Sequence, residues 1–168
     1  VATANAVKLV GAKPVFVDID RKNLCLHLQK TKEAITEKTK AIMLVSINGR
    51  CPQIQDFVNL AKEKNIFLAE DAAQSFGSFF SGKHFGTFGL FGSFSFSAPK
   101  IITMGQGGAL VTDDQELYKK LQKFKDFGRQ ASGADHYEAL GYNLKITDLQ
   151  SVFGLEQMKK LPWRVERK

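Results

Sequence analysis

The stretch AIMLVSINGRCPQIQDFVNLAKEKNIFLAED, residues 41–71, decides the fold. Its two ends, residues 41–45 and 66–69, are short apolar runs that predict buried strands. Between them, apolar side chains recur at i, i+3, i+4 and i+7, which predicts a helix with one apolar face. These side chains are Ile54, Phe57, Val58 and Ala61. A strand, a crossover helix and a second strand form the unit from which parallel sheets are built, so the stretch predicts an α/β fold.

The same alternation continues outside this stretch. Residues 15–17 predict a further buried strand, and SFSFS at residues 93–97 predicts a strand with one aromatic face and one hydroxyl face. For an isolated strand, the simpler interpretation of the second run is a phenylalanine core with serines on a wet face. Taken together, the pattern predicts a mostly parallel sheet with helices on both faces.

Two helices are predicted in the last third of the chain. Asp113 or Asp114 can cap the first of them. The second begins with TDLQ at residues 147–150, a Thr-x-x-Gln capping box, and we expect Pro162 to break it. The sequence shows no internal repeat and no interdomain linker.

The composition is that of an ordinary globular domain, with 43% hydrophobic and 24% charged residues among 168. The 24 Lys+Arg exceed the 17 Asp+Glu by 7, and this net charge makes an anionic partner worth considering. However, the lysines of residues 30–40 and 119–125 fall mostly on the outer faces of predicted helices, and no nucleic-acid-binding motif accompanies them. We therefore expect no nucleic-acid partner.

The cysteines, the histidines and the apolar runs argue against other classes of protein. Cys25 and Cys51 have neither a metal-ligand spacing nor the density of a disulfide scaffold, so we expect a reducing cytoplasm. The 3 histidines are too scattered for a zinc motif, and we expect no bound metal. There is no uninterrupted apolar run of about 18 residues and no secretion pattern, so we expect no membrane partner.

Three features place polar groups where parallel sheets bind ligands. Glu70 and Asp71 end the run at residues 66–69, at the carboxyl end of a predicted strand. Lys100 follows the serine-rich strand, and GQGG at residues 105–108 predicts a turn whose backbone can approach a ligand. Each feature alone is weak, because Asp71 can equally cap a turn and a lone lysine is usually solvated. Together with a serine hydroxyl five residues before Lys100, they supply the amine, the carboxylate and the phosphate donor that pyridoxal phosphate requires.

Several motifs in register resemble the DegT/DnrJ/EryC1/StrS family of sugar aminotransferases. The motifs are ATANA (2–6), GAKPVFVD (11–18), EDAAQ (70–74), SFSF (93–96) leading to Lys100, GQGG (105–108), GYN (141–143) and TDLQ (147–150). Their order and gaps match, and the resemblance covers essentially the whole chain. It implies a fold of the aspartate-aminotransferase type, fold type I of the pyridoxal-phosphate enzymes, with a large α/β domain around a mostly parallel sheet.

The resemblance also implies roles for individual residues. Lys100 matches the lysine that holds the cofactor as a Schiff base and then moves the proton between cofactor and sugar. Asp71 matches the acid that pairs with the pyridinium nitrogen. Ala73 matches a small side chain that packs against the ring, and Gln74 matches an amide that reaches the ring hydroxyl. Ser95 matches the hydroxyl that binds the cofactor phosphate.

Further positions bear on the assembly and the substrate. Asn143 matches an amide that the family sends into the phosphate site of the neighbouring subunit, which implies a homodimer with shared active sites. A lysine at position 100 argues against the related dehydratases, in which histidine replaces it. The segment KIITMGQGG, residues 100–108, resembles the perosamine-synthase-like members, so we expect a nucleotide-linked 4-keto-6-deoxy sugar as substrate and glutamate as amino donor. Gln106 stands where a glutamate is common.

The resemblance places residues 1–168 within the large cofactor-binding domain. Family members have, before this region, a Gly-Ser/Thr loop that holds the phosphate and an aromatic residue that stacks on the ring. After it they have a small C-terminal domain. We therefore expect the chain to be the central part of a longer enzyme, incomplete at both ends. The alternative, that the 168-residue chain is catalytically inactive by itself, stays open at this point.

Overall fold

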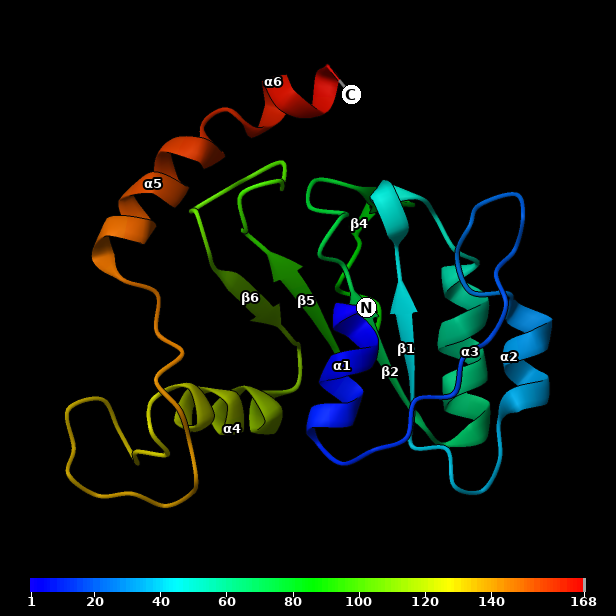
Figure 1. The fold of residues 1–168 in the computed structure, drawn as a ribbon, viewed down its shortest axis with the longest axis horizontal. Helices are drawn as coiled ribbons and strands as arrows, with labels where there is room; N and C mark the ends of the chain where they lie inside the picture. Colours follow the sequence, from blue (N-terminus) through cyan, green and yellow to red (C-terminus); the bar gives the residue numbers. More distant parts are fainter. Residues whose placement is uncertain (168) are drawn as a thin grey trace. The chain divides into compact units, whose positions relative to one another are not determined.

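The structure, a computed structural model, describes residues 1–167. Its main sheet has the strand order β1-β2-β5-β6 (Figure 1). Strands β1 (Ala41–Val45), β2 (Phe67–Asp71) and β5 (Phe91–Ser95) run parallel, and β6 (Gly108–Val111) pairs antiparallel with β5. The predicted mostly parallel sheet is therefore confirmed, and its second strand begins at Phe67 and continues through Asp71.

The chain divides into two compact units, which are described separately. The first unit comprises Val1–Ser95 and Gly108–Val111 and contains all strands of the main sheet. The second unit comprises Phe96–Gly107 and the chain from Thr112 onward. Its helices are α4 (Gln115–Lys125), α5 (Asp148–Met158) and α6 (Leu161–Glu166).

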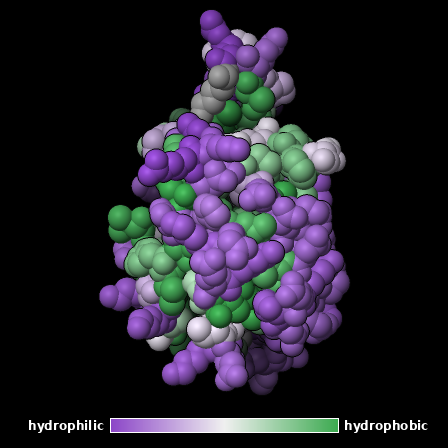
Figure 2. Space-filling model, turned by 90° about the vertical axis from the view of Figure 1, so that its right-hand side faces the viewer, coloured by the Kyte–Doolittle hydropathy of each residue, from purple (hydrophilic) through white to green (hydrophobic). Residues whose placement is uncertain are grey.

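The core of the first unit lies between the sheet and α3 (Ile54–Lys64), the predicted crossover helix. The buried side chains of this core are Ile42, Leu44, Ile54, Phe57, Leu60, Ala61, Leu68 and Phe85. Helix α2 (Leu28–Ala34) lies beside α3 (Figure 1). Figure 2 shows the face that lies to the right in Figure 1, and the surface of this face is mostly hydrophilic, with smaller hydrophobic patches. The crossover helix thus buries its apolar face and leaves its polar face to water, as its sequence period predicts.

The remaining elements of the first unit are short. Helix α1 (Ala2–Leu9) opens the chain, and the 3-10 turn η1 (Ile47–Gly49) follows β1. Strands β3 (Phe79–Phe80) and β4 (Lys83–His84) pair antiparallel in a separate two-stranded sheet. No helix among the described residues is both long and apolar enough to cross a membrane.

The prediction of a buried strand at residues 15–17 is wrong. Val15 and Phe16 are 67% and 81% exposed, and within residues 1–167 the segment joins no strand of either sheet. A strand requires the N–H and C=O groups of a neighbour, and an apolar run alone does not supply them. The nearest pairing is an isolated bridge between Ile19 and Leu26.

The helix caps of the second unit are confirmed, with one correction. Asp114 caps α4 by accepting a hydrogen bond from the Leu117 N–H at 2.8 Å. The capping box of Thr147 and Gln150 begins α5. Pro162, however, does not break this helix, because α5 has already ended at Met158. Pro162 instead lies in the first turn of α6, where a proline removes no hydrogen bond that the helix would otherwise make.

Candidate active site

Asp71 is the last residue of β2 and lies at the carboxyl edge of the parallel sheet. Two hydrogen bonds hold its carboxylate. The Thr3 hydroxyl of α1 donates to Oδ2 at 2.6 Å, and the Ala73 N–H donates to Oδ1 at 3.2 Å. The side chain is partly exposed. It is therefore an oriented acid at the edge where open α/β sheets bind ligands.

The neighbouring acid, Glu70, has a different function in the fold. Because successive strand residues point to opposite faces, Glu70 shares the buried face of Leu68 while Asp71 points to the other face. Glu70 is 1% exposed. Its Oε1 accepts hydrogen bonds from the N–H groups of Phe88 and Gly89 at 2.6 and 2.7 Å, and its Oε2 accepts one from Gly86 at 2.7 Å. Glu70 thus anchors the loop that precedes β5.

Gln74 is held by a turn that follows β1. Its Oε1 accepts a hydrogen bond from the Asn48 N–H at 3.0 Å, and Asn48 has a left-handed backbone with φ of 51°. A side-chain amide has one acceptor end and one donor end, so this contact leaves the NH₂ group of Gln74 available as a donor. A second hydrogen bond joins the segment after β2 to the segment after β1, because the Ser75 hydroxyl donates to the Ser46 carbonyl at 2.7 Å.

Ser95 ends β5 on the same face of the sheet as Asp71. The parallel register pairs Asp71 with Ser93, and Ser95 lies two residues further along the same face. Phe94, on the opposite face, is 7% exposed. The predicted alternation is confirmed for Ser93, Phe94 and Ser95, but the strand ends at Ser95, so Phe96 and Ser97 lie outside it. Within the first unit, the sheet brings Asp71, Ala73, Gln74 and Ser95 to one edge.

Lys100 belongs to the second unit, in the loop formed by Phe96–Gly107. Its backbone N–H donates to the Ser97 carbonyl at 3.0 Å, which closes a turn, and its side chain is half-buried. The loop is closed at its base, where the Phe96 carbonyl accepts a hydrogen bond from the Met104 N–H at 2.9 Å. The predicted glycine turn is confirmed at Gly105, whose φ of +76° suits glycine.

Helices α5 and α6 hold the Lys100 loop within this unit. The Gln150 side chain donates from Nε2 to the Gln106 carbonyl at 3.0 Å, while its Oε1 completes the capping box of α5. The Arg164 guanidinium donates to the Ile101 carbonyl. Both contacts are made to backbone carbonyls of the loop, so Gln106 is bound through its main chain and not through its side chain. The sequence of the loop does not predict these contacts, because every residue has a backbone carbonyl.

Gly154 brings α5 close to the same loop. A Cβ built at this position would lie 2.9 Å from the Met104 sulfur. A glycine inside a helix costs about 1 kcal/mol relative to alanine, so its presence indicates a packing reason. This glycine was the one sequence signal that could have revealed the contact between helix and loop.

Replacing Gln150 with glutamate is expected to loosen the Lys100 loop without removing the helix cap. A glutamate at this position can still accept the hydrogen bond from the Thr147 N–H, but it cannot donate to the Gln106 carbonyl. The loss is about 1 kcal/mol. Hydrogen exchange should show faster exchange at the Met104 amide and unchanged exchange at the Ser151 amide. Equal acceleration at both amides would contradict this division of roles.

Asn143 lies in a short paired segment of the second unit. It forms a bridge with Asp126, and the Leu144 N–H donates to the Lys125 carbonyl at 3.0 Å. The ion pair with Lys145 lowers the pKa of Asp126 below its ordinary value. The Asn143 side chain is exposed. Its predicted role in a neighbouring subunit stays a prediction.

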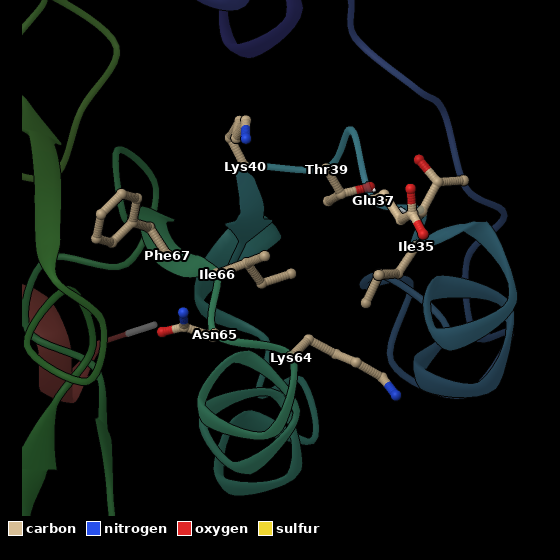
Figure 3. A pocket seen from close by; sticks show the side chains of 9 residues that line it. Ile35, Glu37, Thr39, Lys40, Lys64, Asn65, Ile66 and Phe67 are labelled. Carbon is tan, nitrogen blue, oxygen red and sulfur yellow. Dashed lines mark hydrogen bonds between the residues drawn. The ribbon is translucent and has the colours of Figure 1, made fainter.

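A hollow in the first unit lies at the amino ends of β1 and β2, opposite the end of the strands that carries Asp71 (Figure 3). Its lining includes Lys40, just before β1, and Phe67, the first residue of β2. Figure 3 shows the side chains around it coming also from the ends of α2 and α3. Because ligands of open α/β sheets bind outside the carboxyl ends of the strands, this hollow is not the candidate site.

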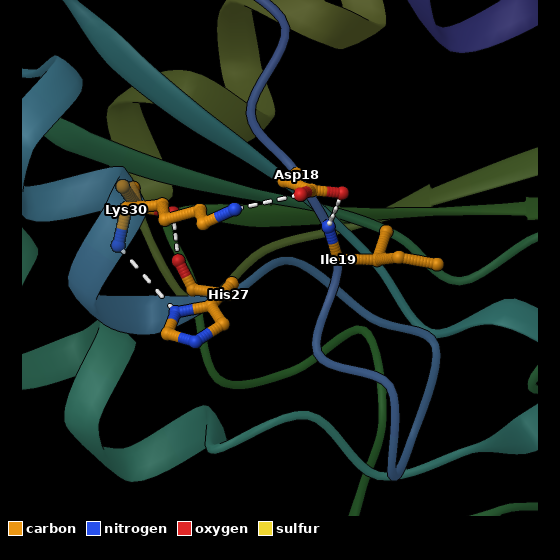
Figure 4. Close-up of polar contacts among 5 residues, drawn as sticks. Asp18, Ile19, His27 and Lys30 are labelled. Carbon is orange, nitrogen blue, oxygen red and sulfur yellow. Dashed lines mark hydrogen bonds and ion pairs between the residues drawn. The ribbon is translucent and has the colours of Figure 1, made fainter.

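The side chains of Lys30 and His27 make local contacts at the start of α2 (Figure 4). Lys30 forms an ion pair with Asp18 at 2.6 Å, and this hydrogen bond lowers the pKa of the Asp18 carboxyl. His27 caps α2 by accepting from the Lys30 N–H at 3.5 Å. The two charged side chains are 50% and 65% exposed, which is the solvated arrangement expected of these lysines.

The cysteines are not activated nucleophiles. Burial raises the pKa of the Cys25 thiol, which is 2% exposed, and desolvation raises the pKa of Cys51 as well. A thiol with a raised pKa carries little thiolate at neutral pH.

Comparison with known proteins identifies related chains. The model of the DegT/DnrJ/EryC1/StrS aminotransferase family matches residues 1–168. GDP-perosamine synthase of Escherichia coli O157:H7 is 39% identical over 168 residues, which are 100% of this chain and 46% of that protein.

Solved structures agree with this result. Helicobacter pylori PseC, an aminotransferase involved in the biosynthesis of pseudoaminic acid, superposes with a TM-score of 0.91 at 33% identity, over 96% of this chain and 44% of its own. An E. coli GDP-4-keto-6-deoxy-D-mannose-3-dehydratase with bound hydrated PLP gives 0.84 at 32% identity, over 93% and 44%. The fold type expected from the sequence is confirmed. The chain spans under half the length of these relatives.

Proposed function

Because the chain belongs to the DegT/DnrJ/EryC1/StrS aminotransferase family, we propose that it forms part of a pyridoxal-phosphate-dependent sugar aminotransferase. One observation carries the proposal. The Asp71 carboxylate is fixed by two hydrogen bonds at the carboxyl edge of the sheet, on the face that also bears Ser95. An oriented acid with a hydroxyl on the same face suits a cofactor that has a basic ring nitrogen and a phosphate.

The residues present fit this cofactor. When bound, pyridoxal phosphate withdraws electrons from the carbon that bears the amino group, so that a proton can leave or join there. Asp71 would pair with the ring nitrogen, and the NH₂ group of Gln74 would donate to the ring oxygen. Ala73 would leave space for the ring, and the Ser95 hydroxyl would bind the phosphate. Lys100 would supply the amine that holds the cofactor and accepts or returns the proton.

The substrate is a nucleotide-linked 4-keto-6-deoxy sugar, with glutamate as amino donor. The name of the 39% identical relative, a GDP-perosamine synthase, supports this class of substrate. A dehydratase is also among the structural relatives, but Lys100 stands where the resemblance places a histidine in dehydratases. An aminotransferase is therefore the better assignment.

The remaining assignments concern the whole protein. The chain forms the central part of the large domain of a longer enzyme, since its relatives are more than twice its length. The enzyme acts in the cytoplasm as a homodimer in which Asn143 reaches the partner's phosphate site. A 168-residue chain that is inactive by itself is the alternative. A cofactor titration of the isolated chain tests a requirement for activity of the chain by itself: an absorbance band that survives dialysis would show that the chain binds the cofactor without further segments.

Borohydride reduction in the presence of pyridoxal phosphate tests the central assignment. Reduction fixes the cofactor to the amine that holds it, and peptide mapping of the whole protein then locates the label. We expect the label in the peptide that contains Lys100. A label on any other lysine would contradict the assignment.

Replacing Asp71 with asparagine is expected to lower the rate of amino transfer by about 10²–10³-fold, because a neutral amide cannot stabilise a protonated ring nitrogen. The measurement is steady-state kinetics of the whole protein with glutamate and a GDP-linked 4-keto-6-deoxy sugar. Asp113→Asn, at an exposed position just before the cap of α4, serves as the matched control and should keep the wild-type rate. An Asp71→Asn variant with the wild-type rate would contradict the role of this carboxylate.

A further inference from the structure

We propose that Thr3 is a positioning residue for Asp71, an inference that rests on the proposed function. The Thr3 hydroxyl donates to the Asp71 Oδ2 at 2.6 Å, across 68 residues of sequence. Hydrogen bonds from a hydroxyl to an ionised carboxylate have lengths of roughly 2.5–2.7 Å and are stronger than neutral ones. The contact therefore has the geometry of a strong tie between α1 and the end of β2.

The position of Thr3 in its helix makes this contact informative. Thr3 lies in the first turn of α1, where a threonine hydroxyl often bonds to nearby backbone groups. Helix α1 has no side-chain cap, and none of its residues is buried. Instead, the Thr3 hydroxyl in the first turn donates a hydrogen bond to Asp71 at the end of β2. A local stabilising role does not require that long-range contact.

The two hydrogen bonds together set the orientation of the carboxylate. Thr3 binds Oδ2 and the Ala73 N–H binds Oδ1, so each oxygen has one donor and the plane of the group is fixed. Each oxygen keeps a further lone pair, which can accept the N–H of a protonated ring. Thr3 thus orients the Asp71 carboxylate before the cofactor arrives.

The test compares Thr3→Val, which keeps the shape but loses the hydroxyl, with Thr3→Ser, which keeps the hydroxyl. In the whole protein, Thr3→Val should weaken the affinity for pyridoxal phosphate about tenfold, while Thr3→Ser stays within about twofold of wild type. The visible circular dichroism of the bound cofactor should fall in Thr3→Val and recover in Thr3→Ser, because this signal reports the orientation of the ring. Thermal melting checks that the variants fold.

A double-mutant cycle separates positioning from a general structural role. If Thr3 acts through Asp71, Thr3→Val should change the cofactor affinity little in an Asp71→Asn background. An additive loss there, an unchanged Thr3→Val variant, or a Thr3→Ser variant as weak as Thr3→Val would each overturn the inference and leave the proposed function standing. A wild-type protein that binds no pyridoxal phosphate would overturn both, and is recognised before any substitution is made.

Discussion

Replacing Lys100 with alanine is expected to lower the rate of the proposed amino transfer by at least about 10⁴-fold, because in the proposed function one amine both holds the cofactor and moves the proton. The loop Phe96–Gly107 contains no second lysine that could take its place. The same variant should also lose the borohydride-stable label. Both effects are measured on the whole protein, by steady-state kinetics and by mass spectrometry of the reduced enzyme.

A matched control for this substitution is Lys120→Ala, which removes an exposed lysine of α4. It should keep both the rate and the label at Lys100. Arginine at position 100 preserves the charge but not a nucleophilic amine, so Lys100→Arg should be as inactive as Lys100→Ala. An active Lys100→Arg variant would show that the side chain acts only through its charge.

The second large effect is expected from Glu70, and it concerns stability. Glu70→Ala leaves the N–H groups of Gly86, Phe88 and Gly89 without their acceptor, and we expect a loss of about 3–5 kcal/mol in the free energy of unfolding. Urea unfolding of the whole protein measures it. Glu70→Gln should lose less, since its carbonyl oxygen can still serve the two donors that share Oε1.

The exposed Glu37 provides the comparison for this stability effect. Glu37→Ala should change the free energy of unfolding by less than about 0.5 kcal/mol, as surface substitutions usually do. If Glu70→Ala were as mild as Glu37→Ala, the buried carboxylate would not be the anchor of the loop before β5.

Much of the fold was predictable because its decisive stretch is governed by local periodicity. The strand at Ala41–Val45 and the helix at Ile54–Lys64 follow directly from the spacing of apolar residues. Residues 15–17 have the same apolar character, but a strand also depends on a neighbour, which a local pattern does not contain. The helix end before Pro162 likewise depends on where the chain turns and not on the proline alone.

The residues of the candidate site could be named from the sequence, but the hydrogen bonds that hold them in place could not. Asp71, Ser95 and Lys100 stand at strand ends or just after them, where sequence motifs are informative. Strand alternation could have separated Glu70 from Asp71, since it places Glu70 on the face of Leu68. The Thr3 contact joins residues too far apart in sequence for any local pattern to reveal.

The left-handed backbone at Asn48 limits which residues can replace it without strain. Glycine, asparagine and aspartate tolerate such a backbone, whereas a β-branched residue would cost roughly 1–3 kcal/mol. If the turn relaxed, the N–H that orients the Gln74 amide would point elsewhere. A substitution at Asn48 is therefore expected to disturb the candidate site through the main chain, although no side chain proposed to bind the cofactor has been changed.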